Sequence, residues 1–171
     1  GVCAVRDQAD GQPNSKVQSV TGVVMTVSAL SLPLTLELGG KSAKIILDDA
    51  PNFAQEVAQS ILVFHAGQGC AVQSRLLVPQ SRYAEAVAVL KKAYEAFADK
   101  WGHFDDEACS MGPVISKKQM ERVKSYIDIG IQEGATLLAG GKLRPDMGTG
   151  WFIEPTCFVD VDNSMRIAQE E

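Results

Sequence analysis

The chain has 171 residues, of which 46% are hydrophobic and 22% charged, an ordinary composition for one globular domain. Its net charge of −5 argues against nucleic-acid binding, because no basic stripe is present to neutralise phosphates. Aromatic residues make up only 6%, so we expect a core of valine, leucine, isoleucine and alanine.

The cysteines and histidines are too scattered for a structural metal site. The four cysteines stand at positions 3, 70, 109 and 157 without a C-x-x-C pair, and the two histidines lack ligand spacing. A chain of this length with an adequate core also does not need a disulfide framework. We therefore expect no metal and a reducing, cytoplasmic setting.

The N-terminal stretch has no clear period. Residues 6–19 are polar and predict a loop or disorder. Residues 17–36 carry no charge, which matches a membrane span in length only, because Gly22, Pro33 and several hydroxyl residues dilute the hydrophobicity. A buried strand over residues 20–27 is the better interpretation, and no membrane contact is expected.

Two short apolar runs follow, over residues 34–38 and 43–47, with a Gly-Gly-Lys-Ser turn between them, and they predict strands. Pro51 suits the first turn of a helix. The apolar residues Phe53, Val57, Ile61 and Phe64 share one helical face, so this helix is expected to end near Gly67 and to place Cys70 just beyond it. A strand is predicted over residues 75–79.

Two long helices are the clearest elements. Ser81 is expected to cap the first, whose apolar stripe is Tyr83, Val87, Leu90, Tyr94, Phe97 and Trp101. Ser116 and Gln119 form a capping-box pattern for the second, and Gly134 suits its C-terminal end. Its expected buried face is Met120, Val123, Ile127 and Ile131.

Strands are predicted again over residues 135–139 and 157–161, separated by a turn-rich loop, and Asn163 is a candidate cap for a last helix or turn. Strands thus alternate with helices from Leu34 onward. This alternation predicts an α/β fold, three-layered, with a largely parallel sheet covered by helices on both faces.

Glu37 and Cys70 are the candidate catalytic residues. Glu37 stands in Leu-Glu-Leu-Gly-Gly-Lys (36–41), and Cys70 ends Gly-Gln-Gly-Cys (67–70). A cysteine thiolate can attack a carbonyl, and a carboxylate can then activate the water that cleaves the acyl adduct. Neighbouring glycines allow close approach of backbone or ligand.

Each residue also has a structural interpretation. A lone cysteine is usually a small buried hydrophobe, as we expect for Cys3, Cys109 and Cys157. Strand alternation would place Glu37 on an outward face with Thr35, whereas burial would raise the pKa of its carboxyl towards that of a useful base. The residues alone leave both alternatives open for Glu37.

The two motifs together resemble the aldehyde dehydrogenase superfamily, whose glutamate signature has the form LELGGK and whose cysteine signature has the form GQ-x-C. Both stand here in the family's order and near its usual separation. The similarity covers about residues 34–171 and includes softer matches at Met111–Ser116, Gly140–Lys142 and Trp151–Thr156. It implies the family's catalytic-domain fold for 34–171 and leaves 1–33 as a poorly matching N-terminal segment.

The resemblance implies oxidation of an aldehyde to a carboxylic acid with NAD or NADP. Cys70 would form a thiohemiacetal and then a thioester, Glu37 would activate water, and the main-chain N–H of Cys70 would supply half of the oxyanion hole. The main chain of Leu38 would contact the nicotinamide amide. Glu171 would bind the adjacent ribose, although a frayed terminal glutamate is an equal alternative.

The chain departs from the family at several points. The N-terminal cofactor-binding region, with the asparagine that completes the oxyanion hole, has no counterpart, and His65 stands where the family commonly has asparagine. The chain opens with Gly1 and stops at Glu171, before the family's oligomerisation strand. We therefore expect a fragment of a protein that is a homo-oligomer at full length, with most of the cofactor-binding region absent.

Two other functions stay open. The chain would be a catalytically inactive fragment if uncovered apolar faces and a sheet edge drove it to self-associate. Alternatively, it would be a thiol-dependent esterase that uses Cys70 without nicotinamide. The identity of the aldehyde and the choice between NAD and NADP are not encoded in these residues.

Overall fold

The computed structural model describes residues 2–7, 40–61, 64–98, 100–103 and 105–170. The described strands are β1 (Val2–Asp7), β2 (Ala43–Ile45), β3 (Arg75–Val78), β4 (Thr136–Ala139) and β5 (Thr156–Val159). The described α-helices are α2 (Phe53–Ala58), α3 (Tyr83–Phe97), α4 (Lys117–Gln132) and α5 (Arg166–Gln169), with short 3-10 turns at Phe64–Gly67, Gln80–Arg82 and Pro145–Met147. The strands predicted over 20–27 and 34–38 lie outside the described residues.

The described strands form one sheet in the order β2-β3-β1-β5-β4. The pairs β2–β3, β3–β1 and β1–β5 are parallel, and β4 runs antiparallel to β5. The mixed α/β class predicted from the alternation of elements is therefore confirmed, with one antiparallel strand at the edge.

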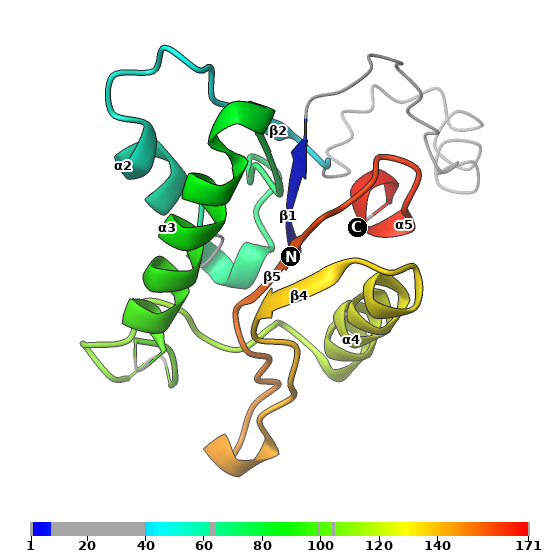
Figure 1. The fold of residues 1–171 in the computed structure, drawn as a ribbon. Helices are drawn as coiled ribbons and strands as arrows, with labels where there is room; N and C mark the ends of the chain where they lie inside the picture. Colours follow the sequence, from blue (N-terminus) through cyan, green and yellow to red (C-terminus); the bar gives the residue numbers. More distant parts are fainter. Residues whose placement is uncertain (1, 8–39, 62–63, 99, 104, 171) are drawn as a thin grey trace, which may run out of the picture.

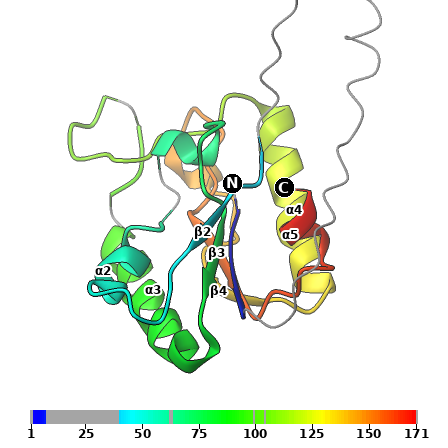
Figure 2. The same ribbon diagram turned by 90° about the horizontal axis from the view of Figure 1, so that it is seen from above.

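Helices lie on both sides of this sheet. Figures 1 and 2 show α2 and α3 on one side of the strands and α4 and α5 on the other. Two apolar clusters match these sides: one joins α2 and α3 with β3, and the other joins α4 and α5 with β5. All four residues of β5 are buried, as expected for a strand covered on both faces.

The central strand β1 was not predicted from the sequence. Its residues pair with β3 from Ala4↔Arg75 to Asp7↔Val78 and with β5 from Val2↔Thr156 to Ala4↔Phe158. The loop predicted to begin at Arg6 is wrong for its first two residues, because the parallel ladder with β3 extends through Asp7. Residues 8–19 of that predicted loop lie outside the described residues.

Helix α3 confirms the predicted stripe in its middle but not at its ends. Leu90 and Tyr94 are buried, whereas Trp101 lies beyond the helix. Ser81 is not the cap: Arg82 occupies the N-cap position and makes no side-chain capping bond, and the Ser81 hydroxyl donates instead to Asp48 Oδ1 at 2.8 Å. A tertiary partner thus takes the hydroxyl that the sequence pattern assigned to the helix end.

Helix α4 begins as predicted. The N–H of Gln119 donates to Ser116 Oγ at 3.2 Å, and Gly134, with φ 93°, follows the C-cap. The buried face includes Val123 and Ile127, but Ile131 is 50% exposed. Tyr126 and Gly130 are buried in its place, so the buried stripe is rotated from the predicted one at its C-terminal end.

Two further expectations are wrong in detail. Helix α2 ends at Ala58, well short of Gly67, and a separate 3-10 turn leads to the cysteine loop. The last helix has Met165 at its N-cap, not Asn163. Both differences are at element ends, where local sequence patterns are least decisive.

Candidate functional site

Cys70 lies in the loop between the 3-10 turn Phe64–Gly67 and β3, and its side chain is exposed. An exposed thiol on a loop held by a sheet is accessible to a carbonyl compound, as a nucleophile must be. Cys157 by contrast is buried in β5, and Cys109 is half-buried with its Sγ donating to Met111 O at 3.0 Å. The two therefore occupy the structural positions expected of them, and the side chain of Cys3 lies outside the described residues.

The turn before Cys70 has an unusual backbone. His65, Ala66 and Gly67 have φ values of 49°, 53° and 73°, so three successive residues are left-handed. For a residue other than glycine this conformation costs about 1–2 kcal/mol. Strain of this kind persists only where the surrounding structure holds it, and it gathers at functional sites.

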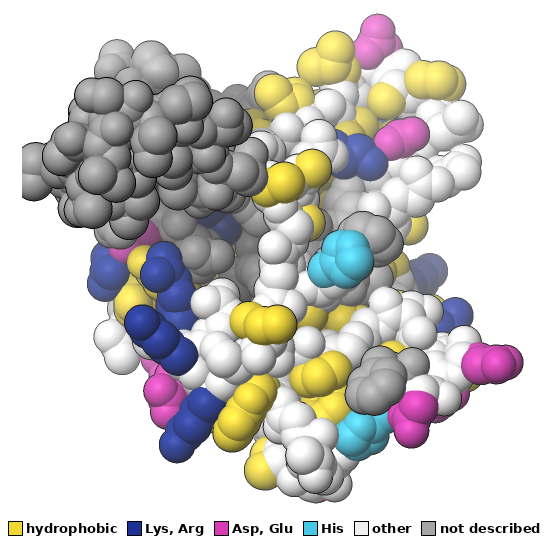
Figure 3. All heavy atoms as spheres, turned by 180° about the vertical axis from the view of Figure 1, so that it is seen from behind, with side chains coloured by type: hydrophobic (Ala, Val, Ile, Leu, Met, Phe, Trp, Pro, Cys, Tyr) yellow, Lys and Arg dark blue, Asp and Glu magenta, His cyan; other side chains and the backbone are white. Residues whose placement is uncertain are grey.

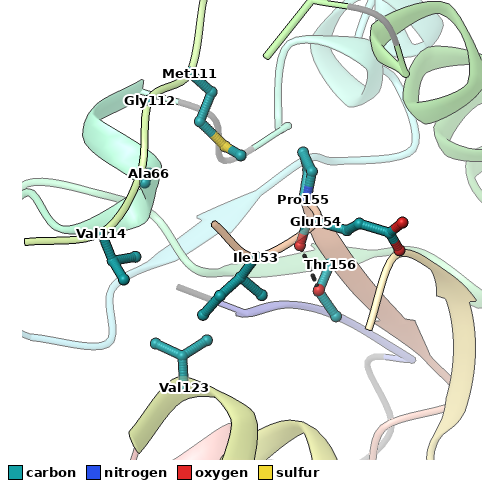
Figure 4. Close-up of a pocket in the computed structure, with 9 residues that line it drawn as sticks. All are labelled: Ala66, Met111, Gly112, Val114, Val123, Ile153, Glu154, Pro155 and Thr156. Atoms are coloured by element: carbon teal, nitrogen blue, oxygen red, sulfur yellow. Dashed lines mark hydrogen bonds between the residues drawn. The ribbon is translucent and has the colours of Figure 1, made fainter. Parts of the chain in front are cut away.

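Contacts with residues 111–115 hold this turn. Ala66 is buried in the same apolar cluster as Met111 and Val114. Figure 4 shows Ala66 on the turn with Met111 and Val114 among the residues around a pocket. The volume of this cavity is about 20 Å³. A cavity of this size has room for about one water molecule but not for an aldehyde, so it is a packing feature under the loop.

The glutamate motif ends beside the cysteine loop. Lys41 Nζ donates to the hydroxyl of Ser74 at 3.3 Å, and Arg75 Nε donates to the main-chain oxygen of Lys41 at 2.9 Å. The N–H of Arg75 also donates to the main-chain oxygen of Ser42 at 3.2 Å. Ser74 is only 8% exposed, so these contacts fix the start of β3 to the end of the first motif.

The strand register extends this proximity. β2 and β3 are parallel, with Ala43 opposite Arg75. Glu37 stands six residues before Ala43 (43 − 37), and Cys70 stands five residues before Arg75 (75 − 70). Because parallel strands present their amino ends at one edge, the described residues just before β2 and just before β3 enter the sheet from the same side.

Cys70 belongs to the described part of the chain, whereas the other three predicted site residues, Glu37, Leu38 and Glu171, lie outside it. Glu170, next to Glu171, accepts hydrogen bonds from the Tyr126 hydroxyl at 2.8 Å and from Arg166. Arg166 first, and Tyr126 second, lower the pKa of the Glu170 carboxyl. This carboxylate is therefore already engaged within the chain.

Gln68 and Ser74 belong to the site's framework but were not singled out from the sequence. Gln68 stands within the cysteine motif, which is a signal that could have marked it, whereas nothing local marks Ser74. Among the residues that the structure describes, no group of three His, Cys, Asp or Glu side chains could hold a metal ion. In the same part of the chain, no helix is long and apolar enough to cross a membrane.

The fold is that of a mixed α/β protein, with an exposed cysteine in the loop that leads into β3 of its sheet. The family model described as "Aldehyde dehydrogenase family" matches residues 18–171. A putative aldehyde dehydrogenase of Staphylococcus saprophyticus is 42% identical over 168 residues, covering 93% of this chain and 35% of that protein. The chain belongs to the aldehyde dehydrogenase family, and it spans about a third of the length of this relative.

Solved structures agree with this membership. The aldehyde dehydrogenase of Mycobacterium tuberculosis complexed with NAD+ superposes with a TM-score of 0.79 at 46% identity, over 88% of this chain and 31% of that one. Aldehyde dehydrogenase C of Pseudomonas syringae, as a cysteine-to-alanine mutant with NAD+ and octanal, has a TM-score of 0.76 at 34% identity and covers 88% and 31%. The similarity therefore concerns one region of these larger proteins.

Proposed function

We propose that this chain is the portion of an aldehyde dehydrogenase catalytic domain that carries the nucleophile Cys70 and the general base Glu37. The full-length protein would oxidise an aldehyde to a carboxylic acid with NAD or NADP, as a cytoplasmic homo-oligomer. Residues 34–171 would form the three-layered catalytic region together with β1 (Val2–Asp7), which lies between β3 and β5 in the same sheet, and the rest of residues 1–33 would be the poorly matching N-terminal segment.

The contact between the end of the glutamate motif and the residues that follow the cysteine motif, at β2 and β3, is the observation that supports this proposal most. Ser74 and Arg75, just after Cys70, bond to Lys41 and Ser42, just after Glu37. In the sequence, Glu37 lies four residues before Lys41 (41 − 37) and Cys70 lies four residues before Ser74 (74 − 70), so both candidates are a short stretch of chain from this contact. This arrangement favours a thiol and a carboxylate that act on the same carbonyl carbon.

The acyl half of the reaction, in which Cys70 is acylated and water then releases the acid, needs only the chain's own groups when an ester is the acyl donor. The Cys70 thiolate attacks the carbonyl carbon of an activated ester, and the bond to the phenolate leaving group breaks with its electron pair. Glu37 then takes a proton from water, whose oxygen attacks the thioester and displaces the thiolate. The main-chain N–H of Cys70 would stabilise the oxyanion that forms in each step.

A bound cofactor would accept the hydride from the substrate. The similar structures from Mycobacterium tuberculosis and Pseudomonas syringae contain NAD+. The expected contacts, from the Leu38 main chain and the Glu171 carboxylate, lie outside the described residues. The acyl half is therefore the part of the reaction that we assign to this chain alone. We propose that the rest of a full-length protein supplies most of the cofactor-binding region.

Hydrolysis of an activated phenyl ester tests the site directly, because acylation of the thiol bypasses the cofactor. The parent chain is compared with Cys70→Ala and with Glu37→Gln. We expect turnover in the parent, none above background in Cys70→Ala, and a burst of one acyl group without further turnover in Glu37→Gln. The burst separates acylation by the thiol from water activation by the carboxylate.

Turnover that survives Cys70→Ala would contradict the assignment of the nucleophile. A linear, burst-free rate in Glu37→Gln equal to the parent's would contradict the assignment of the base. NADH formation from an aldehyde by the 171-residue chain would show that the cofactor binds without the missing regions. Ester turnover without any such formation, even in the full-length protein, would instead identify a cofactor-independent esterase.

Exposed apolar side chains favour a second candidate, an inactive fragment that self-associates. Ile45, in the edge strand β2 of the described sheet, is 56% exposed, Leu47 just beyond this strand is 61% exposed, and Ile115 is 84% exposed. Figure 3 shows apolar side chains visible among polar ones on the face opposite to that of Figure 1. Such edges and patches promote association. A monomeric elution volume at micromolar concentrations would count against this candidate.

A further inference from the structure

The carboxamide of Gln68 connects the two segments that meet at the cysteine loop. Its Nε2 donates to the main-chain oxygen of His65 at 2.9 Å, and its Oε1 accepts from the main-chain N–H of Ile115 at 3.0 Å. The N–H of Gln68 donates to the same His65 oxygen at 3.0 Å. One side chain therefore closes the left-handed turn and also fastens it to a segment 47 residues away.

Only a side chain with a donor group and an acceptor group can satisfy both partners at once. The carbonyl of His65 accepts the carboxamide as a second donor beside the main-chain N–H of Gln68, and the N–H of Ile115 needs an acceptor. These opposite demands also fix which end of the carboxamide faces which partner. Glutamate, when ionised, would retain the bond to Ile115 and lose the bond to His65, and methionine would lose both while keeping a similar length.

The turn that Gln68 closes is the strained one. His65 and Ala66 are left-handed without being glycine, and Cys70 follows two residues after Gln68. Ala66 is buried against Met111 and Val114, so apolar packing and the Gln68 bonds attach the turn to the same segment of residues 111–115 (Figure 4). A shift of this turn would carry the thiol and the N–H of Cys70 with it.

We propose that Gln68 is a positioning residue, which holds the left-handed turn against residues 111–115 and thereby sets the orientation of the Cys70 thiol and N–H. This inference rests on the proposed function of Cys70 as nucleophile. Ester acylation needs the thiol and the oxyanion donor in one fixed geometry, whereas alkylation needs only an accessible thiol. The inference predicts that loss of the Gln68 bonds slows acylation more than alkylation.

The test compares the parent chain with Gln68→Met, Gln68→Glu and the matched control Gln73→Met. Gln73 is an exposed glutamine in the same loop, three residues after Cys70. Three measurements are made on each: acylation of Cys70 by an activated phenyl ester, alkylation of Cys70 by iodoacetamide, and hydrogen exchange of the Ile115 amide by NMR.

We expect ester acylation to fall by about 10²-fold in Gln68→Met, because a displacement of the nucleophile by about 1 Å has that effect. Alkylation by the small, undemanding iodoacetamide should change by less than about 2-fold, since Cys70 stays exposed. Gln68→Glu should lie between the parent and Gln68→Met for acylation and should keep the Ile115 amide protected. Gln73→Met should match the parent throughout.

Equal acylation rates in Gln68→Met and the parent would overturn the positioning role. A parallel loss of alkylation and acylation would overturn it too, because that result indicates changed access or ionisation of the thiol. If the parent shows no acylation above Cys70→Ala, the proposed function fails. Hydrogen exchange of the Ile115 amide then tests by itself whether Gln68 holds the turn against residues 111–115. Faster exchange in Gln68→Met supports this attachment, and unchanged exchange contradicts it.

Discussion

At His65 the backbone is left-handed, with φ 49°. Asparagine adopts this conformation at lower cost than most other non-glycine residues. The asparagine that the family commonly has at this position therefore has a physical reason, independent of any contact with substrate. We expect His65→Asn to raise the free energy of unfolding by roughly 0.5 kcal/mol, a fraction of the penalty for a left-handed residue.

Urea unfolding of the 171-residue chain measures this change, and His103→Asn is the control. His103 is half-buried, and its Nε2 is 2.7 Å from the main-chain oxygen of Met147, so its replacement should lower stability. Changes of the same sign in both variants would contradict the explanation for His65.

The phenol of Tyr83 gives the fold a pH dependence in the alkaline range. Its hydroxyl donates to Asp160 Oδ1 at 2.7 Å and accepts from the N–H of Asp160 at 2.7 Å. Burial first, and the bond to Asp160 second, raise the pKa of Tyr83 from 10.0 to about 12. Because the folded-state pKa exceeds the unfolded value, the stabilisation is complete below pH 10.0 and is lost as the pH rises towards about 12.

The comparison of the parent chain with Tyr83→Phe isolates this effect. We expect the parent to be the more stable at about pH 8 and the difference in unfolding free energy to shrink at about pH 11. Urea midpoints at the two pH values give the difference. A difference that stays constant would show that the Tyr83 hydroxyl does not titrate with a raised pKa.

At the scale of elements, the turn after β4 depends on the absence of a side chain at Gly140. Its φ is 72°, and a Cβ there would stand 2.1 Å from the main-chain oxygen of Pro155. Gly134, after α4, also has a positive φ of 93° but has open space around it. We expect Gly140→Ala to cost more than about 3 kcal/mol of unfolding free energy and Gly134→Ala about 1 kcal/mol.

Thermal or urea unfolding of both variants measures the contrast. The two glycines share the conformational requirement and differ in the clash, so the difference between the variants reports the close approach of the chain at Pro155. Equal destabilisation would mean that the turn can move away from Pro155 at little cost.

Elements were predictable from sequence wherever neighbouring residues decide them. The capping of α4 by Ser116 depends on residues three apart, and the prediction is confirmed. Ser81 fails as a cap because Asp48, 33 residues away, holds its hydroxyl. The extent of α2 differs for a similar reason: the apolar period continues past Ala58, but the chain there turns towards the cysteine loop, which a local pattern does not encode.

At the scale of the whole molecule, the local motif of the site was predictable from the sequence, and the contacts between distant segments were not. The motif around Cys70 was visible in the sequence, and the exposure of its side chain agrees with a nucleophile. The attachment of Lys41 to Ser74 and of Gln68 to Ile115 was not predictable, because each joins segments more than 30 residues apart. Glu37 as the base remains a prediction.

The position of β1 is also a property of the whole molecule. In the described sheet, β1 lies between β3 and β5 and pairs with both, although it precedes the residues matched by the family model. Its removal would leave two separate described pairs, β2–β3 and β5–β4. Nothing in a six-residue segment marks it as central, because pairing with distant strands decides that position.

A proline in β1 tests this arrangement. Val5 lies opposite Leu76 of β3, within the run of residues paired to that strand. Proline removes a ladder N–H and is excluded from central strands, so we expect Val5→Pro to lower the free energy of unfolding by at least about 2 kcal/mol. Val5→Ala retains the N–H and should cost less.

If β1 joins the two halves of the sheet, far-UV circular dichroism and tryptophan fluorescence should also cease to report one coincident transition in Val5→Pro. Identical unfolding of the two variants would place β1 outside the cooperative sheet, because an unpaired strand has no ladder hydrogen bond for proline to remove.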